Sequence, residues 1–153
     1  MKVAGEIMTP DPLTISTLVS PELALTTFLS KKLTVMPIVN PAGKVAGLLS
    51  AVNLVKIMAA FFQSKTRSEK IANYMDFLVP AHFIRKDDSV QIILREMMIS
   101  QSSRLLVSDS TEKLLGIISP VDMLKMFENL TKARSTKVPT EVVAPAVPAA
   151  KAS

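Results

Sequence analysis

One heptapeptide occurs twice in this chain: Gly47-Leu48-Leu49-Ser50-Ala51-Val52-Asn53 returns 69 residues later as Gly116-Ile117-Ile118-Ser119-Pro120-Val121-Asp122. The same spacing relates four further pairs, which are Lys44 and Lys113, Lys56 and Lys125, Leu25 and Leu94, and Ser20 and Ser89. A constant spacing over separate segments indicates an internal repeat of one supersecondary unit. Upstream the spacing changes to 67, which pairs Met8 with Met75, so we expect connecting loops that differ by two residues.

Each copy is predicted to contain a strand, a helix, two strands and a second helix. Ser20-Pro21 is typical of a helix start, and Asn40-Pro41-Ala42-Gly43 is typical of a turn between short apolar strands. The expected strands are 13–16, 35–39, 45–49, 83–85, 105–107 and 114–118, and the expected helices are 21–32, 51–62, 69–75, 89–100 and 120–130. The sequence thus predicts an α/β (α+β) fold of two βαββα repeats, 1–62 and 69–130.

Composition excludes several classes of site. The chain of 153 residues is 48% hydrophobic, enough for a substantial core, and it has no cysteine, so it can form neither a disulfide nor a thiolate metal site. The one histidine, His82, has no metal-ligand neighbour in the sequence. There is no Gly-x-Ser-x-Gly motif, and the four glycines form no phosphate-binding loop. We therefore predict no metal site and no enzyme activity.

Charge and hydropathy bear on location and partners. The N-terminus lacks an apolar signal segment, and the most apolar run, 54–62, is too short to span a membrane, so we expect a cytoplasmic protein. Of the net charge of +5, three units arise after residue 130, which argues against a nucleic-acid-binding fold. Residues 131–153 are rich in Ala, Pro and Lys without a helical or strand period, and this tail is predicted to be disordered.

The repeated motif places chemistry at the start of a helix. Ser119 and free amide groups at the helix N-terminus can hold a phosphate, and Asp122 can accept hydrogen bonds from two ribose hydroxyls. The same residues also suit a simple helix cap, with Ser119 capping, Pro120 at the first position and Asp122 in the first turn. The residues alone leave both interpretations open.

The whole pattern resembles the CBS domain, named after cystathionine beta-synthase. The resemblance covers roughly residues 1–130 and rests on Ile7-Met8-Thr9-Pro10, on the strand Met36-Pro37-Ile38-Val39, on a Gly-Lys turn and on the closing Gly-x-x-Ser-x-x-Asp. It implies two repeats packed as one module with pseudo-twofold symmetry. The chain departs from the family pattern at Asn53 in place of Asp, at Tyr74-Met75-Asp76-Phe77 in place of Met-Thr-Pro, and at Leu106 in place of the strand Pro.

The resemblance also implies two ligand sites, because CBS pairs bind adenine nucleotides in clefts between their repeats. In the family the closing Asp of one repeat holds the ribose, the motif Ser and a nearby basic residue meet the phosphate, and the opening segment and pre-strand loop of the other repeat surround the base. The better site would comprise Ser119, Asp122, Arg104, Thr9, Thr14, Leu33 and Thr34. The weaker site would comprise Ser50, Asn53, Met75, Phe83, Ser102 and Ser103.

Two functions remain open at this stage. One is a regulatory ligand sensor for AMP, ADP, ATP or S-adenosylmethionine, and the other is a structural module without a ligand that acts through dimerisation. The helices 52–62 and 120–130 carry more apolar residues than one core-facing stripe needs, so we expect a homodimer. The regulated effector is expected to be another protein or to act through the tail.

Overall fold

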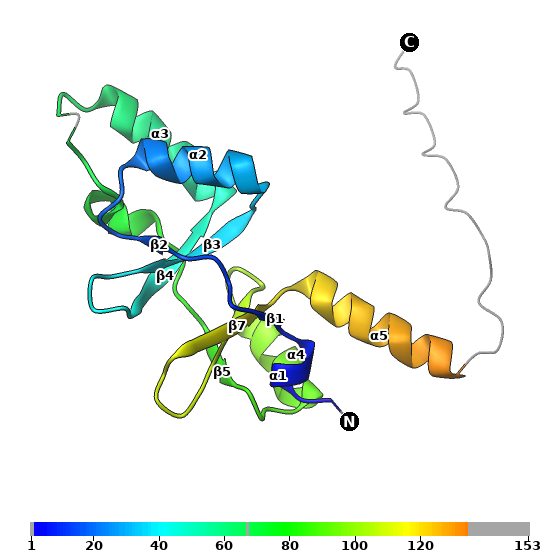
Figure 1. Cartoon of the computed structure of the whole chain (residues 1–153). Helices are drawn as coiled ribbons and strands as arrows, with labels where there is room; N and C mark the ends of the chain where they lie inside the picture. Colours follow the sequence, from blue (N-terminus) through cyan, green and yellow to red (C-terminus); the bar gives the residue numbers. More distant parts are fainter. Residues whose placement is uncertain (1, 67, 135–153) are drawn as a thin grey trace, which may run out of the picture.

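The computed structural model describes residues 2–66 and 68–134, which form two small sheets covered by helices (Figure 1). In chain order the elements are α1 (Ala4–Ile7), β1 (Thr9–Pro10), β2 (Ile15–Ser16), α2 (Pro21–Lys31), β3 (Val35–Val39), β4 (Val45–Ser50), α3 (Ala51–Gln63), the 3-10 helix η1 (Ile71–Phe77), β5 (Phe83–Arg85), α4 (Val90–Ile99), β6 (Leu105–Ser108), β7 (Leu114–Ile118) and α5 (Pro120–Arg134). The predicted pair of βαββα repeats is confirmed.

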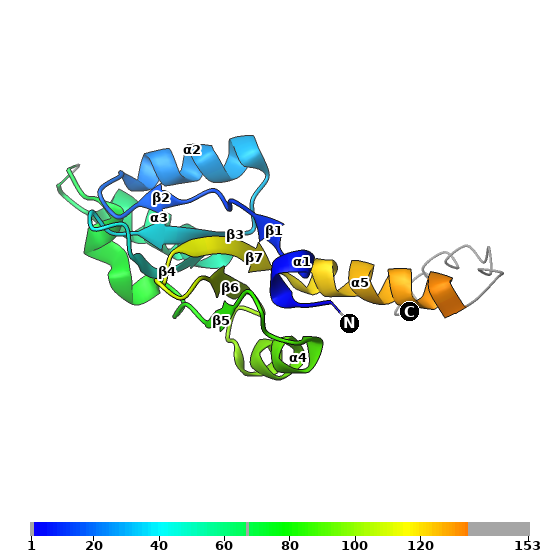
Figure 2. The same cartoon turned by 60° about the horizontal axis from the view of Figure 1, so that its bottom comes forward.

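The two sheets are built alike. One sheet has the order β2-β3-β4 and the other the order β1-β7-β6-β5. In each repeat the first strand runs parallel to the second, and the second and third form an antiparallel hairpin. Figure 2 shows α2 and α4 on opposite outer sides of the molecule, with the strands between them. Each sheet therefore has its own helix cover.

Serine caps fix the starts of three helices. The side chains of Ser20, Ser50 and Ser89 each accept a hydrogen bond from the backbone N–H three residues later, at 3.1, 3.1 and 3.4 Å. Each bond satisfies an amide that has no partner within its helix. Because Ser50 ends β4 and caps α3, the helix begins where the strand stops. The repeated motif therefore forms a direct connection from the last strand of a repeat to its second helix.

The opening segment of each repeat belongs to the other repeat in space. Strand β1 pairs with β7, with Thr9 opposite Ile117. In the same way Val79, which follows η1, pairs with Leu48 of β4 through two backbone hydrogen bonds of 2.8 Å. The core of the second sheet accordingly contains Ala4, and the core of the first contains two residues of η1. The two repeats are interlocked, and the spatial units differ from the sequence repeats.

Glycine in the repeated motif permits this exchange. A Cβ atom at Gly116 would lie 2.3 Å from the Sδ of Met8 and 2.8 Å from the carbonyl oxygen of Thr9. A Cβ atom at Gly47 would lie 3.0 Å from the Cβ of Leu78 and 3.0 Å from the carbonyl oxygen of Val79. Glycine is therefore needed at both positions because another strand of backbone passes directly over them.

The sequence predicted that Met75 corresponds to Met8, and this correspondence does not hold at the exchanged strand. The spacing of 67 holds at the helix starts, since Ala4 donates to the carbonyl of Asp88 as Ile71 does to that of Val19. However, η1 has seven residues and α1 has four. Leu78 therefore lies over Gly47 as Met8 lies over Gly116, and Met75 does not.

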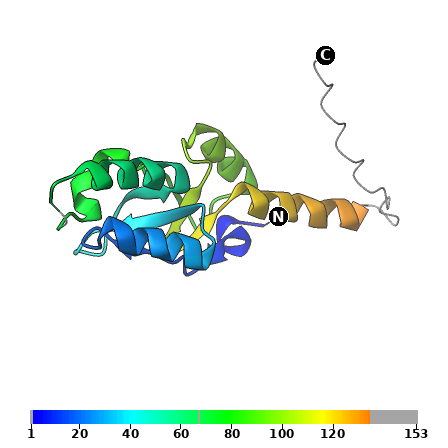
Figure 3. The same ribbon diagram turned by 90° about the horizontal axis from the view of Figure 1, so that it is seen from above.

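The two helix pairs are arranged differently. Helices α2 and α3 pack against each other, whereas α5 extends away from the rest of the molecule (Figures 1 and 3). The predicted end of α5 at residue 130 is wrong, because the helix continues to Arg134, with Lys132 paired to Glu128 at 2.8 Å. The predicted tail thus begins in a helix, and its remainder, 135–153, lies outside the described residues.

Within residues 2–66 and 68–134, no helix combines the length and the apolar character needed to cross a bilayer. In the same ranges, His, Asp and Glu side chains nowhere gather in a group of three or more that could hold a metal ion.

Candidate functional site

Ser119 and Asp122 form a reciprocal cap at the start of α5. The Asp122 Oδ2 atom accepts hydrogen bonds from the Ser119 backbone N–H at 2.8 Å and from its hydroxyl at 2.9 Å. In return, the Asp122 N–H donates to the Ser119 Oγ atom at 3.3 Å. Both side chains are half-buried. The capping interpretation is therefore correct for one carboxylate oxygen, and the other oxygen has a separate contact.

That second oxygen joins the two repeats. The hydroxyl of Thr9, in the exchanged strand β1, donates to the Asp122 Oδ1 atom at 3.4 Å. The contact follows from the exchange, because β1 lies beside β7 and β7 leads directly into α5. A long hydrogen bond from an exposed hydroxyl is weak, so a ligand hydroxyl can compete for this oxygen. The two predicted site residues, Thr9 and Asp122, are thus brought together.

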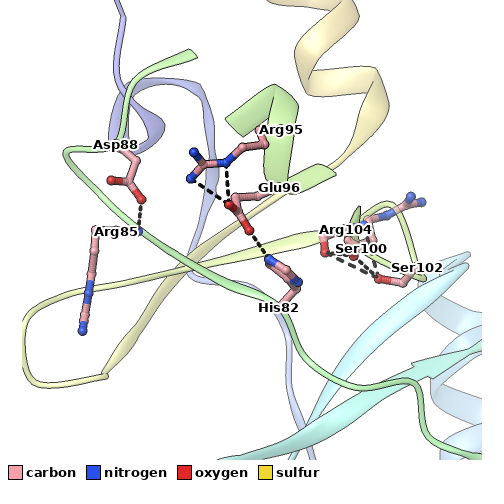
Figure 4. A network of polar contacts seen from close by, with 8 residues as sticks. All are labelled: His82, Arg85, Asp88, Arg95, Glu96, Ser100, Ser102 and Arg104. Atoms are coloured by element: carbon pink, nitrogen blue, oxygen red, sulfur yellow. Dashed lines mark hydrogen bonds and ion pairs between the residues drawn. The ribbon is translucent and has the colours of Figure 1, made fainter. Parts of the chain in front are cut away.

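A second bridge joins the repeats through Arg104. Its guanidinium Nη2 donates to the Thr34 hydroxyl at 3.4 Å, so a cation lies beside the predicted pre-strand loop. The Arg104 backbone is held by two serines: its carbonyl accepts from Ser100 Oγ at 3.0 Å, and its N–H donates to Ser102 Oγ at 3.2 Å (Figure 4). This turn fixes the start of β6 and leaves the guanidinium as the adaptable part.

The helix N-terminus offers less to a phosphate than the sequence indicated. Pro120 has no N–H group, the Asp122 N–H donates to Ser119 Oγ, and the Met123 N–H donates to the Ser119 carbonyl. Of the first-turn amides of α5, only that of Val121 remains. An anion at this place would therefore find a partner in Arg104 more readily than in the helix amides.

The equivalent place in the first repeat has poorer chemistry. Ser50 caps α3 by accepting from the Asn53 N–H at 3.1 Å. Val79 replaces Thr9 as the exchanged residue, and Val35, opposite Ser50, has the position that Arg104 has beside Ser119. This place therefore has none of the three groups found in the second repeat, which are the carboxylate, the bridging hydroxyl and the cation.

The other predicted site residues are more scattered. Thr14 and Ser103 are exposed, and no hydrogen bond within the described residues joins either to the motif. Leu33 packs against the core of the first repeat and lines an apolar hollow between α2 and α3. Met75 lies on the exposed side of η1, and Phe83 lines a different cavity near the hairpin turns. The structure thus gathers Thr9, Thr34, Arg104, Ser119 and Asp122 at the junction of the repeats.

Sequence reasoning missed the exchanged residues of the second repeat, Leu78 and Val79. A signal was present, since Val79-Pro80 corresponds to Thr9-Pro10 at a spacing of 70. Pro10 is the last residue of β1 and lies opposite Gly116, and Pro80 directly follows Val79, which pairs with Leu48. Matching these two prolines would have identified the strand, whereas matching the two methionines did not.

Comparison with known proteins agrees with this geometry. The CBS domain model matches residues 4–60 and again residues 75–129. The chain belongs to the CBS domain family. It contains two CBS domains, and together they form the interlocked pair described above. No curated protein matches the chain in sequence.

Solved structures of CBS pairs share the fold. CBSX2 of Arabidopsis thaliana, solved in complex with AMP, is 22% identical, with a TM-score of 0.70 over 86% of this chain and 99% of CBSX2. The CBS domain pair of MJ0100, solved with 5′-methylthioadenosine and S-adenosyl-L-methionine, is 17% identical, with a TM-score of 0.66 over 85% of this chain and 98% of that pair. CbpB, solved with c-di-AMP, is 13% identical, with a TM-score of 0.69 over 87% of this chain and 89% of CbpB.

Proposed function

We propose that this CBS pair is a regulatory module that binds an adenine nucleotide or an adenosyl ligand at the junction of its repeats and catalyses nothing itself. The carrying observation is the Asp122 carboxylate, which is held by the cap of one repeat and contacted by Thr9 from the other. Arg104, bonded to Thr34, supplies a cation across the same junction. A ribose diol and a phosphate are the groups that such a carboxylate and guanidinium bind.

The ligands of structural neighbours support this class. CBSX2 was solved with AMP, MJ0100 with 5′-methylthioadenosine and S-adenosyl-L-methionine, and CbpB with c-di-AMP. All four molecules carry an adenosine unit, so their shared chemistry is an adenine ring and a ribose. In this chain Asp122 would accept from the ribose, and Arg104 would select ligands that carry a phosphate.

A ligand at this place can act as a signal. Thr9 precedes the first repeat's own sheet, and Asp122 begins α5, so a bound ribose would tie the opening segment to the start of the projecting helix. Binding shifts a conformational equilibrium only if the ligand prefers one arrangement. We therefore expect the orientation of α5 to respond to the ligand and a partner protein to detect the change.

A ligand screen tests the proposal. The melting temperature of the full chain would be followed in AMP, ADP, ATP and S-adenosylmethionine, because a ligand that binds only the folded state raises it. We expect at least one adenine compound to raise the melting temperature of the wild type and to have less effect on Arg104→Met. Guanosine and cytidine monophosphates serve as controls. Equal shifts for all nucleotides would contradict adenine recognition.

The first-repeat place is proposed as a weaker second site, built on Ser50 and Asn53, to which the family resemblance also assigns Ser102, Ser103, Phe83 and Met75. Asn53 offers a neutral amide in place of a carboxylate, so fewer charge-assisted bonds are available. Asn53→Asp should raise the number of nucleotides bound per chain or strengthen the weaker step in calorimetry. An unchanged titration would show that Val79 and Val35 already prevent binding there.

Exposed apolar residues on two helices support a second candidate function, that of a dimerisation module. Val52 and Val55 on α3 are 67% and 69% exposed, and Val121 and Leu124 at the equivalent positions of α5 are 56% and 66% exposed. Two apolar faces related by the internal symmetry suit a second copy of the chain. We expect a homodimer that Val55→Glu converts to monomer in sedimentation, while Lys56→Glu leaves it intact. A monomeric wild type at tens of micromolar would contradict this assembly.

A further inference from the structure

A cavity lies apart from the proposed nucleotide site at Ser119 and Asp122, which is called the nucleotide junction below. It has a volume of about 640 Å³, within the range of small-molecule sites. Its lining comes from three segments: 42–45 in the hairpin turn of the first repeat, 83–88 around β5, and 108–113 in the hairpin turn of the second. Neither Ser119 and Asp122 nor Ser50 and Asn53 contribute to it. The two hairpin turns point to the same side of the molecule (Figure 1).

Two lysines at equivalent positions contribute to the lining. Lys44 and Lys113 are separated by the repeat spacing of 69, and each ends the turn of its hairpin. Neither forms an ion pair with any residue in 2–66 or 68–134. The internal symmetry therefore brings one ammonium group from each repeat to a single cavity, and both remain available to an anion.

A third cation is held in place by its neighbours. The Arg85 guanidinium donates to Ser108 Oγ at 3.4 Å and to the carbonyl of Asp109. The Asp88 carboxylate, three residues along the chain, instead accepts from the Arg85 backbone N–H at 2.8 Å, and the Arg85 side chain points away from it (Figure 4). Arg85 is thus oriented without an ion pair that would neutralise it.

The turn that carries Lys113 is braced by internal hydrogen bonds. Asp109 Oδ1 accepts from the Thr111 N–H at 2.7 Å, from the Thr111 hydroxyl at 2.6 Å and from the Lys113 N–H at 3.0 Å. These bonds, first that of the Thr111 hydroxyl, lower the pKa of Asp109 and satisfy its charge locally. The Asp109 carboxylate therefore braces the turn, while Glu112 and Asp88 are the acidic groups on the cavity wall.

One aromatic ring completes the lining. In β5 the residues alternate exposed, buried and exposed, so Phe83 and Arg85 lie on the same face and Ile84 points into the core. The Phe83 ring is 43% exposed, and it stacks on no other aromatic ring in the described part of the chain. The exposure of positions 83 and 85 shows that this face of β5, the edge strand of its sheet, is open to solvent.

We propose that this cavity is a separate binding site for a phosphate-bearing small molecule with a flat ring. Lys44, Lys113 and Arg85 would hold the phosphates, and Phe83 would stack on the ring. The two wall carboxylates, Asp88 and Glu112, repel anions and offset part of this charge, but the three cations of the lining outnumber them. The proposal is independent of the nucleotide junction at Asp122, because the two places share no residue.

The test uses the full chain labelled with nitrogen-15 and titrated with ATP and, separately, with inorganic tripolyphosphate. We expect the amide signals of residues 43–45 and 111–113 to shift with both probes. Lys44→Ala/Lys113→Ala should weaken tripolyphosphate binding about fivefold, since two exposed charge contacts are lost. The matched control Lys56→Ala/Lys125→Ala removes the same charge from an equivalent pair on the helices and should leave binding nearly unchanged.

Three results would overturn the proposal. One is the absence of hairpin shifts in the wild type at millimolar probe, and another is an equal loss in the two double variants, which would indicate non-specific attraction. The third is loss of the hairpin shifts in Asp122→Ala, which would show that they are relayed from the nucleotide junction.

Phe83→Leu should bind ATP no better than tripolyphosphate, whereas the wild type should prefer ATP. If the wild type shows no such preference, the stacking role of Phe83 is wrong.

Discussion

The two repeats of this chain have the same order of strands and helices and different chemistry at the same place. In the second repeat, Asp122 meets Thr9 from the exchanged strand, and Arg104 stands beside the motif. In the first, Asn53 receives no hydroxyl from the exchanged segment, because Val79 occupies the position that corresponds to Thr9. The repeated element order thus preserves the fold, while a few side chains make the two junctions chemically different.

The repeats also differ in how their second helices are covered. Phe61 of α3 is 6% exposed, and Leu130, the equivalent residue of α5, is 50% exposed. Helix α3 packs on α2, whereas α5 projects from the molecule. The same apolar position is therefore buried in the core of one repeat and half exposed in the other.

The largest expected effect on stability concerns the difference in burial between α3 and α5. Phe61→Ala should lower the free energy of unfolding by about 3–5 kcal/mol, because it removes a buried ring and leaves a cavity. Leu130→Ala should cost less than about 1 kcal/mol, because half of that side chain is already in water. Denaturant unfolding of both variants measures the difference. Equal losses would show that α5 is packed in solution as α3 is.

An intermediate effect concerns the exchanged strands. Gly116→Ala should destabilise the fold by about 3 kcal/mol, because the new methyl group would overlap Met8 and the Thr9 carbonyl. Gly47→Ala should cost about 1 kcal/mol, because its contacts at 3.0 Å need a smaller shift. The comparison requires urea or guanidinium unfolding curves of the two variants. If Gly47→Ala proves the more damaging, the exchange at Val79 is tighter than that at Thr9.

The smallest effect concerns a pair that only the second repeat has. The hydrogen bond from His82 to Glu96, of 2.5 Å, is the main cause of a lowered pKa of Glu96, followed by that from Arg95. A lowered pKa stabilises the fold above the unfolded value of 4.5, and this stability is lost as pH falls through the folded value.

The melting temperature difference between wild type and Glu96→Gln should therefore shrink from about pH 7 to about pH 3. The equivalent residue in α2, Thr27, donates to the Leu23 carbonyl at 2.8 Å. Nothing in that contact titrates, so the effect of Thr27→Ala should be the same at both pH values. A constant difference for Glu96→Gln would mean that the pair is not formed in solution.

Much of this structure follows from the repeat in the sequence. The constant spacing predicted the two βαββα units, and the motifs at Ser20, Ser50, Ser89 and Ser119 predicted four helix starts, because caps are local signals, whereas α1 and β1 were not predicted. The exchange of opening segments was beyond local reasoning, since it depends on which sheet edge each segment meets. The bond from Arg104 to Thr34 could not be derived either, because it joins residues 70 apart across a tertiary junction.

The ribose role of Asp122 is tested most directly by calorimetric titration of AMP into wild type, Asp122→Ala and Asn53→Ala. Asp122→Ala should bind about ten- to a hundredfold more weakly, since charge-assisted hydrogen bonds contribute roughly 1.5–3 kcal/mol. Asn53→Ala should lose less than about threefold, because an amide accepts more weakly than a carboxylate. If Asp122→Ala binds AMP as tightly as the wild type, Asp122 serves only to cap α5 and the proposed ligand site is wrong.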